Sequence, residues 1–280
     1  VYWSPIEPFE KLISVSKGGT LKGLRNIQPG RNLQVKPFII GNQIRAEEKT
    51  KNSDAGIDVK FSITPSLTLD ATYNTDFSQV EADEERVNLT RFPLFFPEKR
   101  DFFLENASLF EFGDISNYLY RMSPSRYRRS FSMFHSRRIG LEDGEQIPIT
   151  GGARLSGKIG NFDVGYINMT AEGTENIPQT QFNVSRIRGN FLKKSNFGAI
   201  LIDRNSNGED RDHQSMGLDL NFNINKILIY TYFAQTENPE TEGENTAGRV
   251  AVAYRDNKWD LSAYYKKVGR EFRPQVGFIQ

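Results

Sequence analysis

The residues of this chain that have the chemistry for catalysis are carboxylates gathered in one stretch of the sequence. Glycoside hydrolysis needs two carboxyl groups at a set separation, one acting as general acid and the other as nucleophile or base. Six residues qualify by type, namely Glu81, Asp83, Glu84, Glu85, Glu98 and Glu105. No motif fixes any two of them at that separation, and an exposed loop would have the same composition. A hydrolase therefore stands as an alternative function, with Glu81 and Glu98 as the residues to test.

Histidine and cysteine offer little further chemistry. The chain has no cysteine and two histidines, His135 and His213. A Ser-His-Asp triad would have to use one of them, and no third histidine is present to build a metal site. His135 lies in a stretch that reads as a strand, and His213 lies in a polar loop. The sequence therefore predicts no cofactor and no histidine- or cysteine-based metal site.

One short motif has the residue types of a calcium loop. Asp203, Asn205, Asn207 and Gly208 match the first half of an EF-hand loop, in which oxygen ligands surround the ion and glycine permits a sharp turn. The twelfth position is Gln214 where the bidentate glutamate is expected, and no helix is predicted on either side. We favour a polar hairpin loop here and keep a weak calcium site as the alternative.

The elements that position these residues are strands with strict alternation. Along residues 216–224 every second residue is apolar, and glycine, aspartate and asparagine fill the positions between. Successive side chains of a strand point to opposite faces, so one face of this strand is apolar and the other is polar. The same pattern recurs at 57–63, 67–73, 250–254 and 259–265, and more weakly at 151–159, 162–170, 185–193 and 197–203.

The connections between these strands alternate in length. Short turns are predicted at Pro65, Gly160, Ser195, Asn225 and Asn257. Long polar loops are predicted at 171–181, 204–214 and 236–247. Outer-membrane barrels combine short periplasmic turns with long external loops.

These patterns predict an all-β fold, an antiparallel up-and-down β-barrel of the outer-membrane type, with roughly twelve strands in this chain. Aromatic residues near strand ends (Tyr73, Tyr254, Trp259 and Tyr265) resemble an interfacial girdle. A soluble β-sandwich or soluble barrel, whose strands also alternate, is the alternative. A helical membrane protein is excluded because no apolar run approaches the length of a spanning helix. The net charge of +1 gives no field that would favour nucleic acid.

We interpret residues 1–280 as a single barrel region. The chain begins with Val1 and ends at Phe278-Ile279-Gln280, inside what reads as another strand. We therefore expect a fragment of a longer protein and a partial barrel.

Residues 74–135, here called the insert, interrupt the hairpin pattern. They mix aromatic and charged residues without a period. Aperiodic segments of this length tend to be functional or to fold inward. The insert is predicted to be a plug inside the barrel, with Glu98 to Asp101 pairing with lumen charges such as Arg249 or Asp260. An external loop packed on itself is the alternative.

The insert and the residues after it also carry a family resemblance. Its motif residues are Asp76, Phe77, Gln79, Glu81, Asp83, Phe95, Phe96, Pro97, Glu98, Lys99, Arg100, Phe102, Phe103 and Glu105, followed by Arg137 and Arg138. They resemble an uncharacterised family of outer-membrane β-barrel proteins found in Bacteroidota and related bacteria. In that family the barrel typically follows an N-terminal domain similar to a family 9 carbohydrate-binding module. The resemblance implies a bacterial outer-membrane location and assigns no catalytic residue.

Three functions follow from these patterns. The first is an outer-membrane barrel for transport or surface binding, with membrane lipid as a partner and glycans as a further partner through the N-terminal domain that the resemblance implies. The second is a membrane-associated hydrolase acting on glycans, with its site in the insert. The third is a barrel that anchors a carbohydrate-binding domain. No nucleic-acid partner is expected.

Overall fold

The structure is a computed structural model that describes residues 22–23, 32–45, 49–74, 95–114, 131–142, 145–173, 177–192, 194–207, 212–239 and 242–279. The chain divides into two compact units, residues 1–31 and 32–280. The fold described below is that of the second unit.

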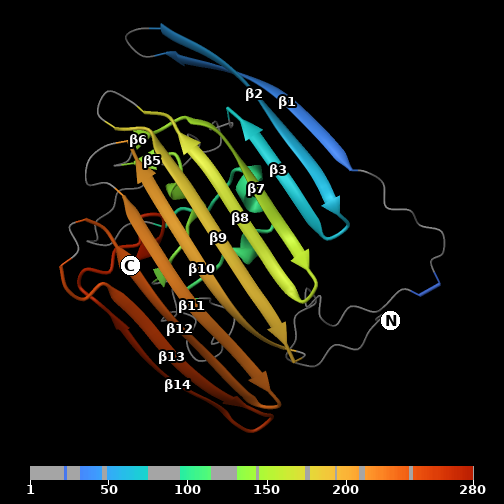
Figure 1. Ribbon diagram of the computed structural model, residues 1–280, viewed down its shortest axis with the longest axis vertical. Helices are drawn as coiled ribbons and strands as arrows, with labels where there is room; N and C mark the ends of the chain where they lie inside the picture. The colour runs from blue at the N-terminus through green and yellow to red at the C-terminus, as the bar shows by residue number, and fades with distance from the viewer. Residues whose placement is uncertain are drawn as a thin grey trace. The chain divides into compact units, whose positions relative to one another are not determined.

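The second unit is built on one antiparallel sheet of eleven strands. Each strand pairs with the next strand of the sheet along the chain, and Figure 1 shows them side by side in that order. The strands are β1 (Leu33–Arg45), β2 (Lys49–Thr64), β3 (Leu67–Tyr73), β7 (Ile149–Ile159), β8 (Phe162–Ala171), β9 (Thr180–Phe191), β10 (Ser195–Ser206), β11 (His213–Ile224), β12 (Ile227–Glu237), β13 (Thr246–Arg255) and β14 (Asp260–Val268). The long excursion between β3 and β7 contains the insert.

The predicted all-β, up-and-down architecture is confirmed. The sheet is not closed, because no pairing joins β1 to β14 among the described residues. None of the described helices is long or apolar enough to cross a membrane.

Short turns connect the strands at one end of the sheet. Turns at 65–66, 160–161, 225–226 and 256–259 lie where the sequence predicts them. The turn predicted at Ser195 is displaced to residues 192–194, because Leu192 adopts a left-handed conformation (φ 55°) and Ser195 already begins β10. Strand β9 accordingly runs from Thr180 to Phe191, where the pattern predicts 185–193.

The long connections lie at the other end and are shorter than predicted. They run over residues 172–179, 207–212 and 238–245, because the strands on either side extend into the predicted loops. The strand ends therefore form two rows, one on each side of the sheet along the strand direction. The row with the tight turns is here called the short-turn edge, and the opposite row carries the longer connections.

The two faces of the sheet differ sharply in composition. The outer face carries exposed apolar residues, among which Leu218 of β11 is 62% exposed. The inner face carries buried polar and charged residues, including Arg154, Arg186, Asp219 and Arg249. The alternation along β11 predicts this division, since Met216, Leu218 and Leu220 face outward while Gly217 and Asp219 face inward.

The inner face is covered by residues 95–114 and 131–139, here called the inner segment. It contains α2 (Asp101–Leu104), η2 (Ala107–Leu109), β4 (Phe131–Ser132) and η3 (Ser136–Arg138), and Figure 1 shows it behind the strands. Two short strands follow, β5 (Leu141–Glu142) and β6 (Glu145–Gln146). Aromatic and aliphatic residues of the inner segment and the sheet form one hydrophobic core, among them Phe103, Phe110, Phe112, Phe131, Met133, Ile167, Met169, Val184, Ile200 and Tyr232.

The strand expected at the C-terminal residues forms at Phe278–Ile279, although it does not join the eleven-stranded sheet, and Gln280 lies outside the described residues. Strand β15 (Phe278–Ile279) pairs with β4 of the inner segment. Phe272 and Val276 are buried in the same core, and Phe278 is also buried. In this position the apolar side chains are removed from water, which favours packing on the inner segment.

Candidate functional site

The inner segment is the candidate site, because it brings together most of the described residues singled out by sequence. Phe95 to Glu105 and Arg137 with Arg138 lie within it. Asp76, Phe77, Gln79, Glu81 and Asp83 lie outside the described residues.

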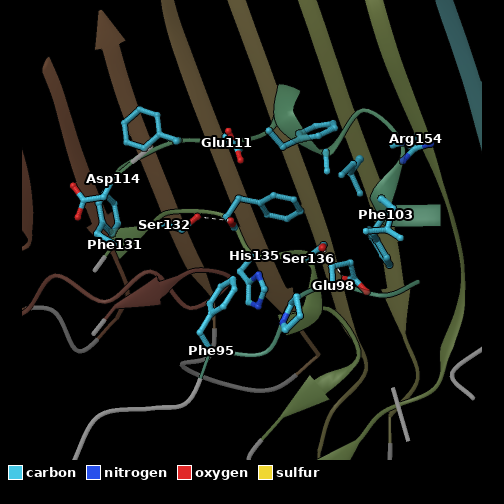
Figure 2. A pocket seen from close by; sticks show the side chains of 17 residues that line it. Phe95, Glu98, Phe103, Glu111, Asp114, Phe131, Ser132, His135, Ser136 and Arg154 are labelled. Carbon is cyan, nitrogen blue, oxygen red and sulfur yellow. Dashed lines mark hydrogen bonds between the residues drawn. The ribbon is translucent and has the colours of Figure 1, made fainter. Parts of the chain in front are cut away.

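Glu98 and Arg100 form a buried ion pair that joins the two halves of the inner segment. The Glu98 carboxylate accepts hydrogen bonds from Arg100 Nε and Nη2 at 2.9 and 2.8 Å. It also accepts from the backbone N–H groups of Lys99 and Arg100 and from Ser136 Oγ at 2.7 Å. Arg100 donates in turn to the carbonyl oxygens of Ser136 and Ile139. Figure 2 shows Glu98 facing Ser136.

These contacts decide the charge of Glu98. Burial favours the neutral acid, but the hydrogen bonds and positive charge of Arg100, together with Ser136, outweigh it and hold the pKa of Glu98 below its usual 4.5. A general acid needs a raised pKa and a free oxygen near its substrate. Glu98 has neither property, so its geometry supports a structural role rather than hydrolysis.

The predicted pairing of the Glu98 region with Arg249 or Asp260 is wrong. Glu98 pairs with Arg100, and Asp101 pairs with Lys36 at 3.6 Å. Arg249 pairs with Asp114, while Asp260 pairs with Arg255. Partners close in sequence satisfy Glu98 before it can reach the far strands.

Arg154 holds one end of the inner segment to the sheet. Its guanidinium, which is buried, donates to Asp70 Oδ2 on the neighbouring strand at 2.8 Å. It also donates to the carbonyl oxygens of Phe102 and Glu105. The Glu105 carboxylate in turn pairs with Lys60 of β2. This cluster ties the region around α2 to β2, β3 and β7.

Asp114 holds the other end of the described stretch 95–114. Its Oδ1 accepts hydrogen bonds from Tyr232 Oη at 3.0 Å and from Arg249 Nη1 at 2.8 Å. Its Oδ2 accepts from Lys266 Nζ at 2.7 Å. One carboxylate thus contacts β12, β13 and β14. Residues 101–114 therefore cross the inner face between two ionic clusters. One is centred on Arg154 and the other on Asp114.

Glycines of the inner face make room for the aromatic side chains between these clusters. A Cβ at Gly165 would lie 2.7 Å from Phe110 Cζ, and one at Gly217 would overlap the ring of Phe112. A Cβ at Gly198 would lie 2.6 Å from Arg186 Nη1 and 2.8 Å from Asp219 Oδ1, so the Arg186–Asp219 ion pair passes over this glycine. The inner segment therefore has a fixed position on the strands.

A cavity of about 290 Å³ lies within this region, as Figure 2 shows. Its lining includes Phe95, Phe110, Phe112, Phe134 and His135, with Glu98, Glu111 and Asp114 as the acidic members. The rings of Phe95 and His135 stack with centroids 4.8 Å apart. His135 Nε2 lies 3.1 Å from the carbonyl oxygen of Phe96. The histidine is thus packed against an aromatic ring and bonded to backbone.

The two arginines of the later motif differ in environment. Arg137 is buried, donates to the carbonyl oxygen of Pro97 at 3.2 Å and lies over the Phe96 ring. Burial lowers the pKa of Arg137 from its usual value. Arg138 is exposed and lines a smaller cavity of about 100 Å³ together with Arg204.

The calcium candidates are not brought together as ligands. Asp203 Oδ1 accepts a hydrogen bond from Gln214 Nε2 at 2.7 Å on the neighbouring strand. Asn207 Nδ2 donates to Gln179 Oε1. Asp203 and Asn205 lie in β10, which continues to Ser206 where the sequence predicts a loop. Across the described ranges no group of three or more His, Asp or Glu residues is placed to hold a metal ion.

Comparison with known families gives one match. The model of a family described as a domain of unknown function (DUF5916) matches residues 29–211. A search of curated proteins returned no match.

Comparison with solved structures returns outer-membrane proteins at low similarity. Outer-membrane expressed OmpT of Vibrio cholerae is 9% identical with a TM-score of 0.34, over 91% of this chain and 94% of that chain. The in-vitro folded trimer form of the same protein is 10% identical with a TM-score of 0.30, over 86% and 89%. A mutant porin of Rh. blastica is 8% identical with a TM-score of 0.26, over 84% and 86%. At these TM-scores the likenesses carry no part of the functional argument.

Proposed function

This chain belongs to the family described as a domain of unknown function (DUF5916), and on that premise we propose that it forms part of an outer-membrane β-barrel. The inner segment acts as a plug inside the barrel, and the barrel serves transport or surface binding. The connection to glycans is the part of this proposal that rests on the family resemblance alone.

The apolar outer face of the sheet is the observation that carries the proposal. Its exposed large side chains recur on neighbouring strands, and include Ile187, Phe197, Leu201, Met216, Leu218, Phe233, Val250, Val252, Leu261 and Tyr265. Soluble monomers rarely expose a continuous apolar surface of this extent. Nine residues of β11 at about 3.4 Å each, tilted by about 45°, give an apolar height of roughly 20 Å, close to the ~25 Å band of outer-membrane barrels.

The same face becomes polar toward the long connections. Asn168 Nδ2 donates to Asn183 Oδ1 at 2.7 Å, and both side chains face outward. Asp203 and Gln214 form a similar outward pair further along the sheet. This change limits the apolar band on one side, as expected where strands leave the hydrocarbon layer. A uniformly apolar face buried against another domain would not need such a boundary.

The inner face supports an occupied barrel interior. Arg154, Arg186 and Arg249 are buried there, and each pairs with a carboxylate. Charges of this kind are placed on the lumen side of a membrane barrel, because lipid cannot solvate them. The two ionic clusters then hold the inner segment across the lumen.

Membrane insertion is tested with the full chain refolded in detergent and in phosphatidylcholine vesicles. We expect heat-modifiable mobility on gels, extraction only by detergent, and protection of the strands from protease. A chain that stays soluble without detergent and shows no heat-modifiable form would contradict the proposal.

The plug is tested by conductance in planar bilayers. The wild-type chain is expected to conduct weakly, and the Asp114→Asn/Glu105→Gln variant to conduct more, because it loses a carboxylate in each ionic cluster. Glu244→Gln is the matched control, since Glu244 pairs only at the surface with Lys267. If the wild type and the double variant are both silent while inserted, the transport role is replaced by surface binding or anchoring.

A further inference from the structure

The short-turn edge carries a row of lysines. Four of the five short turns among the described residues have an exposed lysine in or beside them, namely Lys158, Lys194, Lys226 and Lys258. The hairpins of an up-and-down sheet place their turns along one edge, so these four positive charges form a line. Lys158 and Lys226 also pair with Asp163 and Asp256 at 3.6 and 3.2 Å.

Each lysine has an exposed apolar residue within two positions in the sequence. Lys194, Lys226 and Lys258 lie in turns, whereas Lys158 lies in β7 at an inward-facing position, on the face opposite to Ile159. Ile159 follows Lys158, Leu192 lies two residues before Lys194, Ile227 follows Lys226 and Trp259 follows Lys258. These side chains are between 43% and 60% exposed. Lysine near an apolar surface extends its methylene stem along that surface and keeps its ammonium group in the polar layer. The row therefore lies at the boundary of the apolar band.

Aromatic rings line the same edge. Phe162, Phe191, Phe197 and Phe222 contact one another, with centroids 6.1 to 6.5 Å apart. Lys226 Nζ lies 5.9 Å from the centroid of the Tyr254 ring. Aromatic side chains with lysines beside them are the composition of a membrane–water interface.

Three long connections at the opposite edge are acidic, although residues 267–273 add three basic side chains there. The sequence ranges 171–181, 204–214 and 236–247, which contain the long connections, carry nine acidic and two basic residues. An anionic surface attracts the lysines of the short-turn edge and repels these three acidic connections.

We propose that the short-turn edge binds the phosphate groups of anionic phospholipids in the leaflet that it faces. This inference rests on the proposed membrane location and adds a lipid partner and an orientation to it. An acidic protein could also pair with four lysines. The apolar and aromatic neighbours of the turn lysines Lys194, Lys226 and Lys258 favour lipid, because they place these charges at headgroup depth.

The test measures lipid selectivity of the full chain reconstituted into phosphatidylcholine vesicles that contain phosphatidylglycerol. Spin-labelled analogues of the two lipids report which one associates with the protein. The variant is Lys158→Gln/Lys194→Gln/Lys258→Gln, which leaves the contact of Lys226 with Tyr254 in place. The matched control is Lys267→Gln/Arg270→Gln/Arg273→Gln, which removes three positive charges from the other edge.

We expect the wild type and the control to prefer phosphatidylglycerol by about fivefold at low salt, the gain typical of one lysine near an anionic surface. The lysine variant should show a preference near one, because the lysine that it keeps, Lys226, is neutralised by its pair with Asp256 at 3.2 Å. Added salt should weaken the wild-type preference. Insertion into pure phosphatidylcholine tests the membrane location separately. A wild-type chain that inserts without lipid preference overturns this inference alone, as does a lysine variant that retains the preference. A chain that inserts in no vesicle overturns both proposals.

Discussion

At the scale of single residues, Glu98 links stability to pH. Its folded-state pKa lies below 4.5 because Arg100 and Ser136 stabilise the ionised form more than burial opposes it. The pair therefore contributes stability that is fully present above about pH 4.5 and is lost as the pH falls through the folded-state pKa.

Glu98→Gln is expected to lower the free energy of unfolding by about 3 kcal/mol at pH 7, because it leaves Arg100 buried without its carboxylate. Urea unfolding in detergent from pH 7 to pH 3 measures this. The difference between wild type and variant should shrink toward zero below pH 4.5. If the free energies of unfolding of wild type and variant differ by the same amount at every pH, ionisation of Glu98 does not cause the pH dependence.

Asp114, among the described residues, has partners that are far away in the sequence. It contacts Tyr232, Arg249 and Lys266, which lie 118 to 152 residues further along the chain. Asp114→Asn should lower the free energy of unfolding by about 3 kcal/mol, because Arg249 and Lys266 would then lack a negatively charged partner. Glu244→Gln, which breaks an exposed pair, should cost less than ~1 kcal/mol. Equal urea midpoints for the two variants would refute the role assigned to Asp114.

At the scale of elements, the position of the inner segment depends on glycines beneath aromatic rings. Gly165→Ala should destabilise the fold by about 1–3 kcal/mol, because its methyl group would overlap Phe110 and Leu109. Gly248→Ala is the control, since its nearest heavy atom is a backbone oxygen at 3.5 Å. Adding Phe110→Leu should recover part of the loss in a double-mutant cycle. If the changes in unfolding free energy caused by Gly165→Ala and Phe110→Leu simply add, Gly165 and Phe110 are not in contact.

The alternation along the strands made most of the sheet predictable. The alternation along residues 216–224 is compatible only with a strand that has one apolar face. The turn at 160–161 is predicted by the turn-forming pair Gly160-Asn161. The displaced turn at 192–194 was not predictable, because leucine and lysine have no marked turn preference. Tertiary pairing placed it there by setting the register of β9 against β10.

The location of the inner segment could not be derived from its own residues. Phe95, Phe96, Phe102 and Phe103 have no period, so they indicate burial without indicating a partner. Asp114 gave no signal because its partners are remote in sequence. The signal that was available lay in the sheet: Gly165 and Gly217 occupy inward positions of strands, and glycine there marks the close approach of another segment.

At the scale of the whole molecule, an apolar outer face and a charged inner face are on opposite sides of one sheet. A soluble sheet protein would bury the apolar face and expose the charged one. This chain buries its charges beneath the inner segment and leaves the apolar side chains exposed. Lipid is the environment that we propose for the apolar face of this arrangement.

The most direct test of this account is a cysteine scan along β11, which is practical because the chain has no cysteine. Single cysteines at positions 215–222 carry a spin label in reconstituted vesicles, and collision with oxygen and with a water-soluble nickel complex measures the exposure of each label. We predict lipid exposure at Met216, Leu218, Leu220 and Phe222, and shielding at Ser215, Gly217, Asp219 and Asn221. Water exposure at the first set, or the reverse alternation, would contradict an outer-membrane wall.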